Sequence, residues 1–173
     1  LSKVGFVKHA VWSDLDNDGD KDLVLSLEWD GIVVFVNDKG TFSKKYLTDK
    51  KGWWNFTLPV DVDGDGDPDL VAGNLGQNNR LKGSDNQVVK LYYNDFDGNG
   101  KKEQLLTYYL RGKEIPFATK DELVKQVPEL KKKYLYAEEF AKANLTEIFK
   151  KEKFEKAALL TANYFSNVIL INN

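Results

Sequence analysis

The sequence predicts a mainly β chain with one helical segment inserted into it. Short apolar runs bounded by turn residues recur along the chain, as in residues 22–28, and such runs are typical of β-strands. Acidic loops that contain glycine recur between these runs with one constant spacing. Residues 119–156 differ, because their apolar side chains follow the spacing of a helix. We therefore expect β-hairpins whose turns are the acidic loops, together with a group of helices.

The acidic loops share one pattern of side chains. Counted from its first aspartate, each loop has an oxygen-bearing side chain at positions 1, 3, 5 and 9 and a glycine at position 6. The first loop spans residues 14–22, the second 61–69 and the third 95–103. The residues predicted to surround an ion are Asp14, Asp16, Asp18, Asp20 and Asp22 in the first loop, Asp61, Asp63, Asp65, Asp67 and Asp69 in the second, and Asp95, Asp97, Asn99, Lys101 and Glu103 in the third.

This spacing suits a hard cation such as Ca²⁺, which takes about six to eight oxygen ligands. Alternate residues of a tight loop can point inward, so positions 1, 3 and 5 converge on one centre. Glycine at position 6 allows the positive φ that folds the loop, position 7 offers its backbone carbonyl, and position 9 closes the cage. The alternative is that the loops are acidic turns without an ion, since Asp, Asn and Gly favour turns.

The sequence predicts two strong calcium sites and one weaker site. The first two loops carry aspartate at all four side-chain positions. The third loop has Asn99 and Glu103 at two of them, and it places Lys101 and Lys102 inside the loop. We therefore expect the third loop to bind calcium more weakly than the other two.

The loops are predicted to connect β-strands rather than helices. An EF-hand requires a bidentate Glu at loop position 12 and a helix after the loop. Position 12 is Leu25, Ala72 or Leu106 in the three loops, and short strand-like runs follow the first two. Strand-like runs also precede each loop. This arrangement excludes an EF-hand and a dockerin-like helix pair, and it places each ion in the turn of a β-hairpin.

The pattern Asp-x-Asp-x-Asp-Gly-x-x-Asp-Leu-Val between strands resembles the FG-GAP or VCBS repeat, the calcium-binding blade unit of integrin-α-type β-propellers. The resemblance covers residues 4–110 and implies a partial β-propeller of two to three blades plus the helical insertion. Residues 52–55, 70–79 and 93–100 resemble bacterial propeller proteins of the cartilage acidic protein group, which often carry an ASPIC/UnbV-type domain. The literal Phe-Gly…Gly-Ala-Pro signature is absent, so the comparison with integrins concerns the fold.

Residues 4–47 are predicted to form the first repeat. A strand reaches Ser13, the first loop follows, and a turn at residues 29–31 separates strands over residues 22–28 and 32–36. A fourth strand runs through Phe42 and Tyr46. Four short strands match a propeller blade. The first and second loops start 47 residues apart, which is close to the roughly 40–50 residues of known propeller repeats.

Residues 53–112 are predicted to contain the second repeat and the start of a third. Residues 53–76 restart the strand–loop–strand pattern, and the polar segment 77–87 is predicted to be a long loop. Two more strands surround the third loop within residues 88–112. The second and third loops start only 34 residues apart, so this unit is irregular.

Residues 119–156 are predicted to be a helical insertion. Thr119 and Glu122 form a capping box at its start, and Pro128 is expected to stop or restart the first helix. We expect these helices to cover the edge or end of a blade; a lid over a partner or ligand is the alternative. Residues 157–173 are predicted to return to strand.

Composition narrows the class of protein. The net charge of −2 arises from an acidic excess in the predicted metal loops, which argues against a nucleic-acid partner for the β segment. No run of 18 apolar residues is present, so no membrane span is expected.

The chain has no cysteine and therefore no disulfide. Extracellular calcium modules bind at about 10⁻⁴–10⁻³ M, so we expect an extracytoplasmic location, whether secreted, periplasmic or at the cell surface.

Two and a half blades cannot close a propeller. A closed ring hides its blade edges through radial repetition. We therefore expect the chain, which starts at Leu1, to be a piece of a longer protein. The exposed blade edge would then meet the remainder of the propeller or another copy of the chain.

The function expected from these features is a non-enzymatic interaction module for a protein or glycan, with structural calcium and no catalytic residues. His9 is the only histidine, and nothing near it in the sequence marks it as a catalytic base. The alternative is part of a polysaccharide-processing lyase or hydrolase, or a lectin, with its active residues elsewhere. Trp53 and Trp54 are the candidates for stacking on sugar, since neighbouring residues of a strand cannot both face one side.

Overall fold

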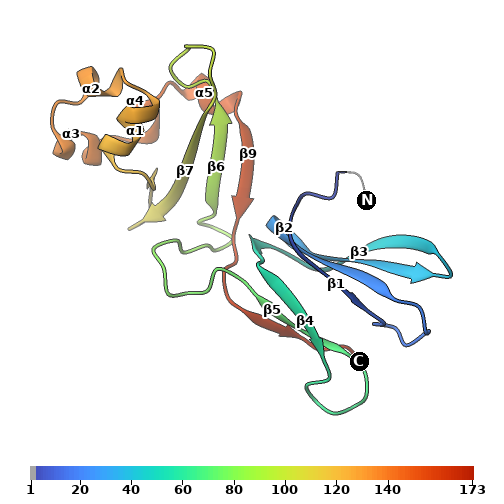
Figure 1. Ribbon diagram of the computed structural model, residues 1–173. Helices are drawn as coiled ribbons and strands as arrows, with labels where there is room; N and C mark the ends of the chain where they lie inside the picture. Colours follow the sequence, from blue (N-terminus) through green and yellow to red (C-terminus); the bar gives the residue numbers. More distant parts are fainter. Residues whose placement is uncertain (1–2) are drawn as a thin grey trace. The chain divides into compact units, whose positions relative to one another are not determined.

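The computed structural model describes residues 3–173, which divide into two compact units (Figure 1). Unit 1 consists of residues 3–80 and 162–173, and unit 2 consists of residues 81–161. The described chain is mainly β, as predicted, and its sheets are antiparallel and open. None of the helices in residues 3–173 has the length and apolarity needed to cross a membrane.

The first sheet of unit 1 contains β1 (Phe6–Ser13), β2 (Asp22–Asp38) and β3 (Thr41–Trp53) in the order β1-β2-β3. The 17 residues of β2 would span roughly 50 Å if the strand were straight. Its two ends instead lie close together: the Asn37 N–H, near the end of β2, donates to the carboxylate of Asp22, at its start, at 2.8 Å. The chain therefore reverses within β2.

The reversal coincides with the turn predicted at residues 29–31. The pairing of β2 with β3 shifts register between Glu28 and Val33, and Trp29 has a φ of 67°. Gly31 allows a close approach there, because a Cβ on it would lie 1.9 Å from the Thr48 carbonyl oxygen. The sheet is therefore a meander of four antiparallel segments, although the last one extends to Trp53, beyond the predicted end near Tyr46.

The second sheet of unit 1 contains β4 (Phe56–Val60), β5 (Asp69–Gly73) and β10 (Val168–Leu170), in the order β10-β5-β4. The second acidic loop connects β4 to β5. Since β10 pairs with β5 but follows unit 2 in the sequence, unit 2 is inserted within this sheet. The inserted unit is larger than the helical segment 119–156, because it also contains strands and the third acidic loop.

The two sheets of unit 1 pack face to face around one apolar core. Its buried residues come from β2, from β5 and from Trp54, and Trp54 has no exposed surface. The Trp54 ring stacks on Tyr164, and its Nε1 donates to the Lys50 carbonyl at 3.0 Å. The core residues are Val24, Ile32, Val34, Trp54, Leu70 and Ala72.

Unit 2 is a sheet covered on one face by short helices. The sheet contains β6 (Val89–Asn94), β7 (Glu103–Leu110), β8 (Lys113–Pro116) and β9 (Ala158–Ala162), in the order β8-β7-β6-β9. Sequence analysis did not predict β8, which follows a tight turn with positive φ at Arg111 and Gly112. The helices are α1 (Lys120–Gln126), α2 (Leu130–Lys133), α3 (Ala137–Lys142), α4 (Leu145–Ile148) and α5 (Lys151–Glu155).

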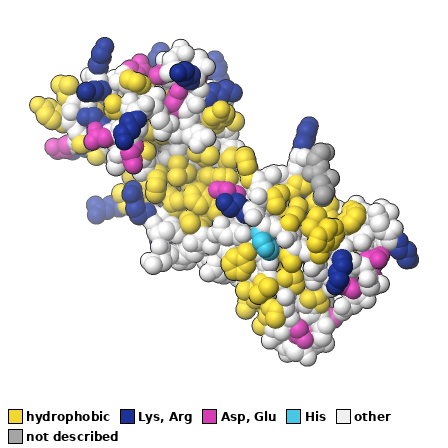
Figure 2. Space-filling model, in the orientation of Figure 1, with side chains coloured by type: hydrophobic (Ala, Val, Ile, Leu, Met, Phe, Trp, Pro, Cys, Tyr) yellow, Lys and Arg dark blue, Asp and Glu magenta, His cyan; other side chains and the backbone are white. Residues whose placement is uncertain are grey.

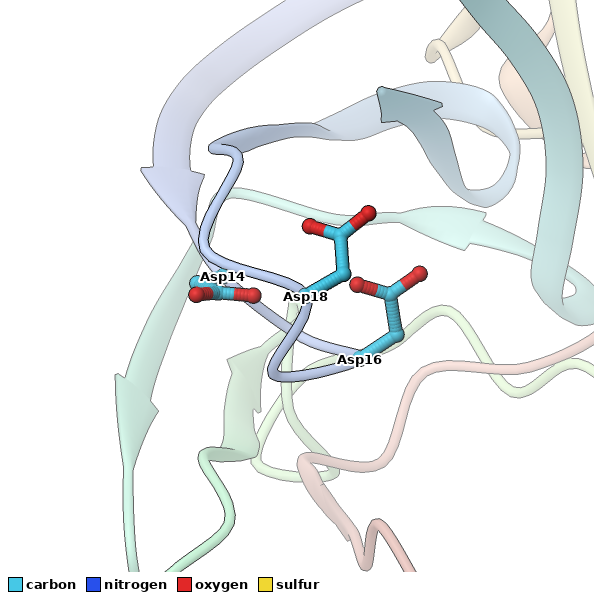
Figure 3. Close-up of side chains that lie close together, drawn as sticks. All are labelled: Asp14, Asp16 and Asp18. Atoms are coloured by element: carbon cyan, nitrogen blue, oxygen red, sulfur yellow. The ribbon is translucent and has the colours of Figure 1, made fainter. Parts of the chain in front are cut away.

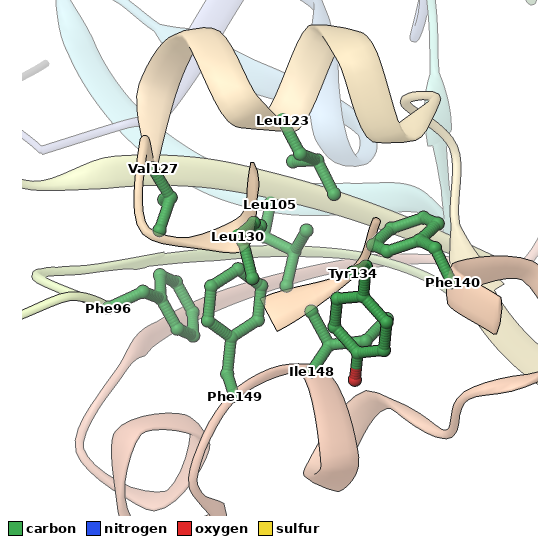
Figure 4. Packing of buried hydrophobic residues seen from close by; sticks show 9 residues of the cluster. All are labelled: Phe96, Leu105, Leu123, Val127, Leu130, Tyr134, Phe140, Ile148 and Phe149. Carbon is green, nitrogen blue, oxygen red and sulfur yellow. The ribbon is translucent and has the colours of Figure 1, made fainter. Parts of the chain in front are cut away.

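The helices bury one cluster of large apolar side chains against this sheet (Figure 4). Each helix is too short to be stable alone, so this packing holds the helices in place. Leu105 of β7 and Phe96 of the third loop contribute to the cluster, and the Phe96 ring lies 4.8 Å from that of Phe149. The cluster consists of Phe96, Leu105, Leu123, Val127, Leu130, Tyr134, Phe140, Ile148 and Phe149.

The predicted capping box at the start of α1 is confirmed. The Glu122 carboxylate accepts the Thr119 backbone N–H at 2.7 Å, and the Thr119 hydroxyl accepts the Glu122 N–H. We expect Thr119→Ala to lower the free energy of unfolding by about 1 kcal/mol, because it leaves one N–H at the helix start without its partner. Urea unfolding monitored by circular dichroism measures this loss. Thr41→Ala, at an exposed residue of β3, is the control, and an equal loss in both variants would contradict the capping role.

Candidate metal sites

Each acidic loop brings several carboxylates together. Ligand oxygens of three acidic residues lie within 4.8 Å of one another in every loop. In the first two loops these residues occupy positions 1, 3 and 5, and Figure 3 shows this for the first loop. In the third loop they occupy positions 1, 3 and 9. The groups are Asp14, Asp16 and Asp18; Asp61, Asp63 and Asp65; and Asp95, Asp97 and Glu103.

The backbone of the three loops follows one plan. The glycine N–H at position 6 donates to the position-1 carboxylate at 3.1, 3.1 and 2.9 Å in the three loops, in chain order. The N–H at position 7 donates to the side-chain oxygen at position 5 at 2.8, 3.0 and 2.7 Å. Because the bonds recur in the same register, the three sequences fold into the same loop.

Two positions in each loop have positive φ. The predicted position is the glycine at position 6, with φ of 92°, 100° and 86°. Sequence analysis missed position 4, which is Asn17, Gly64 or Gly98 and has φ of 55°, 83° and 84°. The signal was present, because Asn and Gly are the residues that adopt this conformation most readily.

The residue at position 9 fastens the loop. Asp22 and Asp69 are completely buried, and each accepts the backbone N–H of position 2, from Leu15 or Val62, at 2.9 Å. Glu103 accepts the N–H of Phe96 in the same way at 2.8 Å. The other oxygen of Asp22 accepts from Asn37, and that of Asp69 accepts from Asn172, both at 2.8 Å.

The side chains at positions 5 and 7 are held within or beside the loops. At position 7, Asp20 accepts the Lys39 N–H at 2.8 Å, and Asp67 accepts from the Asn17 amide. The position-7 carboxylates of the first two loops therefore bind other parts of the protein. The predicted ligand at position 7 is the backbone carbonyl, in the third loop that of Lys101, and these side-chain bonds do not involve it. At position 5 of the third loop, the Asn99 amide donates to Asp97 at 2.9 Å.

The electrostatics of the first two loops favour a bound cation. Desolvation and the neighbouring carboxylates raise the pKa of Asp16 and of Asp63, because like charges converge on each position-3 side chain. One oxygen of Asp14 is also buried and has no hydrogen-bond partner. A cation would satisfy that oxygen and offset the repulsion, so the residues present fit a calcium ion.

The third loop has a different environment. The N–H groups of Gly100 and Gly98 lower the pKa of Asp95, and the Lys153 ammonium contributes in the same direction. The Lys153 Nζ donates to the Asp95 backbone carbonyl at 2.7 Å, and the Asn94 amide donates to the Lys153 carbonyl at 2.6 Å. Helix α5 therefore brings a positive charge to this loop.

We expect Lys153→Met to tighten calcium binding at the third loop by about threefold to tenfold, because it removes a positive charge close to the loop. Calorimetric titration measures the change in a chain whose first two loops carry Asp16→Asn and Asp63→Asn. Lys156→Met, at an exposed residue just after α5, is the control. An unchanged affinity in the Lys153 variant would contradict this role.

The other candidate residues lie outside the loops. The His9 Nδ1 accepts the Thr57 N–H at 3.4 Å, which links β1 to β4. Of the predicted sugar-binding pair, Trp54 is buried and Trp53 is half-buried against Trp29 and Phe165. Trp12 is the exposed tryptophan, at 56%. Contacts with segments that are distant in the sequence decide how far each of these tryptophans is buried.

Sequence analysis also missed a polar network in unit 2. The half-buried Glu114 carboxylate accepts from the Lys90 ammonium at 2.7 Å and from the Thr107 hydroxyl at 2.6 Å. The hydroxyls of Tyr92 and Tyr109 lie 3.4 Å from the same carboxylate. It borders an open cavity of about 490 Å³ beside α4 and α5. All of these polar groups have protein partners, so the network is a structural link between β6, β7 and β8.

Comparison with known proteins agrees with the loop geometry. A family model described as an FG-GAP-like repeat matches residues 14–72, which begin at the first position of the first loop and end in β5. Neither curated proteins nor solved structures gave a significant match. The matched segment contains the first two acidic loops and the strands between them. Residues 14–72 are therefore similar to an FG-GAP-like repeat.

Proposed function

We propose that the chain is a non-enzymatic, calcium-binding segment of a β-propeller, and that it serves as an interaction module for a protein or a glycan. The observation that carries the proposal is the convergence of three carboxylates in each of three loops with a shared backbone plan. Calcium would be structural: it would join the two strands of each hairpin and neutralise the acidic loop.

Calcium would act by favouring the folded state. The three carboxylates of each group converge only when the loop is closed, so the ion binds the folded chain in preference to the unfolded one. Position 9 holds the loop closed from the other side, through the N–H of position 2. The first two loops belong to unit 1, and their closure fixes the β1–β2 and β4–β5 hairpins.

An extracytoplasmic location follows from the same proposal. Loops with this ligand set fill at extracellular calcium concentrations, about 10⁻³ M, and remain empty at cytosolic ones. The narrower resemblance to the cartilage acidic protein group and a bacterial source stay predictions. The remainder of a propeller, another copy of the chain, or a protein or glycan ligand are the proposed partners.

Thermal melting in calcium, in magnesium and in EDTA tests the calcium proposal. We expect calcium to raise the melting temperature, EDTA to reverse the rise, and magnesium to have a much smaller effect because it demands a stricter octahedral geometry. A melting temperature that is the same in calcium and in EDTA would refute structural calcium. Binding to a glycan array, with Trp12→Ala as the control for stacking, tests the lectin alternative.

A polysaccharide-processing enzyme remains the second candidate from the sequence. In unit 2 the polar network around Glu114 is the group of titratable residues closest to such chemistry. Desolvation raises the pKa of Tyr92, and its hydroxyl lies beside the Glu114 carboxylate, so this tyrosine is a poor general base. We therefore keep the interaction module as the proposed function. A lyase assay that follows the absorbance of unsaturated products tests the enzyme.

A further inference from the structure

The two acidic loops of unit 1 are joined to each other by hydrogen bonds. The side-chain amide of Asn17, at position 4 of the first loop, donates to the Asp67 carboxylate, at position 7 of the second loop. Asn172, which follows β10, contacts both loops: its backbone N–H donates to Asp69 at 2.8 Å, and its side-chain amide donates to the Leu15 carbonyl at 2.7 Å. We call the two side-chain bonds, Asn17–Asp67 and Asn172–Leu15, the inter-loop bonds.

The contacts of Asn172 differ from those of its counterpart in the first sheet. Asn37 and Asn172 each come directly after a run of apolar residues, and each donates its backbone N–H to the position-9 carboxylate of the loop in its own sheet. The Asn37 side-chain amide donates to the Lys21 carbonyl of that same loop at 3.2 Å. The Asn172 side-chain amide instead donates to Leu15, in the loop of the other sheet. The same kind of residue that fastens one loop in the first sheet therefore joins two loops when it follows β10.

Asn172 holds the first loop at a point between two of its candidate ligands. Leu15 lies between Asp14 and Asp16, at positions 1 and 3. Its N–H donates to the Asp22 carboxylate at 2.9 Å, and its carbonyl accepts from Asn172. Because Leu15 is held on both sides, the directions in which the two neighbouring carboxylates can point are restricted. One of these, Asp14, has the buried oxygen without a hydrogen-bond partner.

Asn17 makes a second connection, toward the ligands of the second loop. It lies between Asp16 and Asp18 and has the φ of 55° that turns the first loop. Its amide holds the Asp67 carboxylate, and the Asp67 N–H donates to the Asp65 carboxylate, at position 5 of the second loop, at 3.0 Å. A chain of contacts therefore connects candidate ligands of one loop with those of the other.

We propose that the inter-loop bonds couple the two calcium sites of unit 1, so that filling either loop tightens calcium binding by the other about fivefold or more. An ion closes the loop that it fills. The closed loop then holds its part of each inter-loop bond in place, so the other loop loses less conformational freedom when it closes. Linkage makes the effect reciprocal, with the same factor for both sites. The inference rests on the proposed function, because it takes both loops as calcium sites.

Charge acts in the opposite direction. Two bound ions repel each other, and an ion in one loop reduces the negative charge that attracts an ion to the other. Most candidate ligands of the two loops are exposed, and Figure 2 shows acidic side chains at the surface of the molecule. Salt therefore weakens the repulsion. The side chains of Asn17 and Asn172 are neutral, so replacing them by neutral residues removes the inter-loop bonds without changing the charge of either loop.

Two substitutions remove the inter-loop bonds and spare the backbone of the loops. Asn17→Gly gives position 4 the residue that the second and third loops have there, and that residue has a positive φ in them as Asn17 does. Asn172→Ala removes the side-chain amide and keeps the backbone N–H that Asp69 accepts. The control is Asn173→Ala, at the exposed neighbouring residue. Circular dichroism verifies that each variant is folded.

Calorimetric titration with calcium at about 0.15 M salt measures the coupling. Every sample carries Asp97→Asn, which weakens the third loop, so that the first two loops account for the binding. Adding Asp63→Asn leaves the first loop as the working site, and adding Asp16→Asn leaves the second. The coupling factor is the overall constant for filling both loops divided by the product of the two single-loop constants. These substitutions are made with and without the inter-loop bonds, so their effects on charge cancel in the comparison.

We expect the coupling factor of the chain with both inter-loop bonds to be about fivefold or more above that of the Asn17→Gly/Asn172→Ala variant. Each single variant should lie between these two, and Asn173→Ala should match the chain with both bonds. Equal coupling factors with and without the inter-loop bonds would overturn the proposal, as would an effect of Asn173→Ala as large as that of the double variant.

Failure of this inference and failure of the proposed function give different results. Calcium that binds both loops with the same coupling factor in every variant refutes the coupling and leaves structural calcium intact. A chain that binds calcium at neither loop refutes both.

Discussion

In about 10 mM calcium, the double variant Asp16→Asn/Asp63→Asn gains little of the stability that the unchanged chain gains. With dissociation constants of about 10⁻⁴–10⁻³ M, two filled sites add roughly 3–5 kcal/mol to the free energy of unfolding. The variant keeps the loop backbone but removes one charged ligand from each of the first two loops. Urea unfolding with and without calcium measures the difference.

The effect of the same variant on stability changes sign when calcium is removed. In EDTA we expect it to melt at a higher temperature than the unchanged chain, because it removes the crowded carboxylates that raise the pKa of Asp16 and Asp63. The control is Asp38→Asn/Asp49→Asn, which changes two exposed aspartates of unit 1 outside the loops. Lower stability of the loop variant in both buffers would contradict a repulsive cluster held together by metal.

The pH dependence of calcium-free stability follows from the same shifts. A raised carboxyl pKa means that the folded chain binds the proton more tightly than the unfolded chain. The penalty at Asp16 and Asp63 is therefore present at pH values above their folded pKa and is relieved as the pH falls through it. Protons also compete with calcium for these oxygens, so we expect the calcium-dependent rise in melting temperature to shrink on acidification toward pH 4. A calcium effect that does not change with pH would contradict carboxylate ligands.

Replacing Asp22 by asparagine should lower the free energy of unfolding by about 2–3 kcal/mol. Asp22 is completely buried and accepts two backbone N–H groups, from Leu15 at 2.9 Å and Asn37 at 2.8 Å. An asparagine amide turns one of these acceptors into a donor, so one buried N–H faces another N–H. Chemical denaturation measures the loss, and it should be present in EDTA because the two bonds do not require an ion.

Asp38→Asn is the control for this substitution, since Asp38 lies exposed at the end of β2. An effect of Asp22→Asn that vanished in EDTA would contradict the role of position 9 as the fastening residue of the apo loop.

Asp69, the equivalent residue of the second loop, has the opposite pH behaviour to Asp63. The N–H groups of Asn172 and Val62 lower the pKa of Asp69, so its stabilisation is complete above the ordinary pKa of aspartate and is lost as the pH falls through the lowered value.

Local sequence patterns predicted the local parts of the structure. The 1-3-5 spacing of Asp14, Asp16 and Asp18 gave the converging carboxylates, and the glycine at position 6 gave the turn, because both depend on a few neighbouring residues. The capping box at Thr119 and the reversal after Glu28 are local for the same reason.

Parts that depend on distant segments could not be predicted in this way. Ile169 pairs with Val71 although all of unit 2 lies between them in the sequence, and neither strand contains a local pattern that predicts this pairing. The burial of Trp54 depends on Tyr164, which follows that insertion. The fastening role of position 9 was also hidden, since spacing gives the position of Asp22 but not the N–H groups that its two oxygens accept.

Isothermal titration of the chelator-stripped chain with calcium tests the central claim most directly. We expect two sites with dissociation constants of about 10⁻⁴–10⁻³ M and a third, weaker site. Asp16→Asn/Asp63→Asn should remove the first two and leave the third. The absence of any calcium binding would contradict the account and would mean that the three loops are acidic turns held by their own hydrogen bonds.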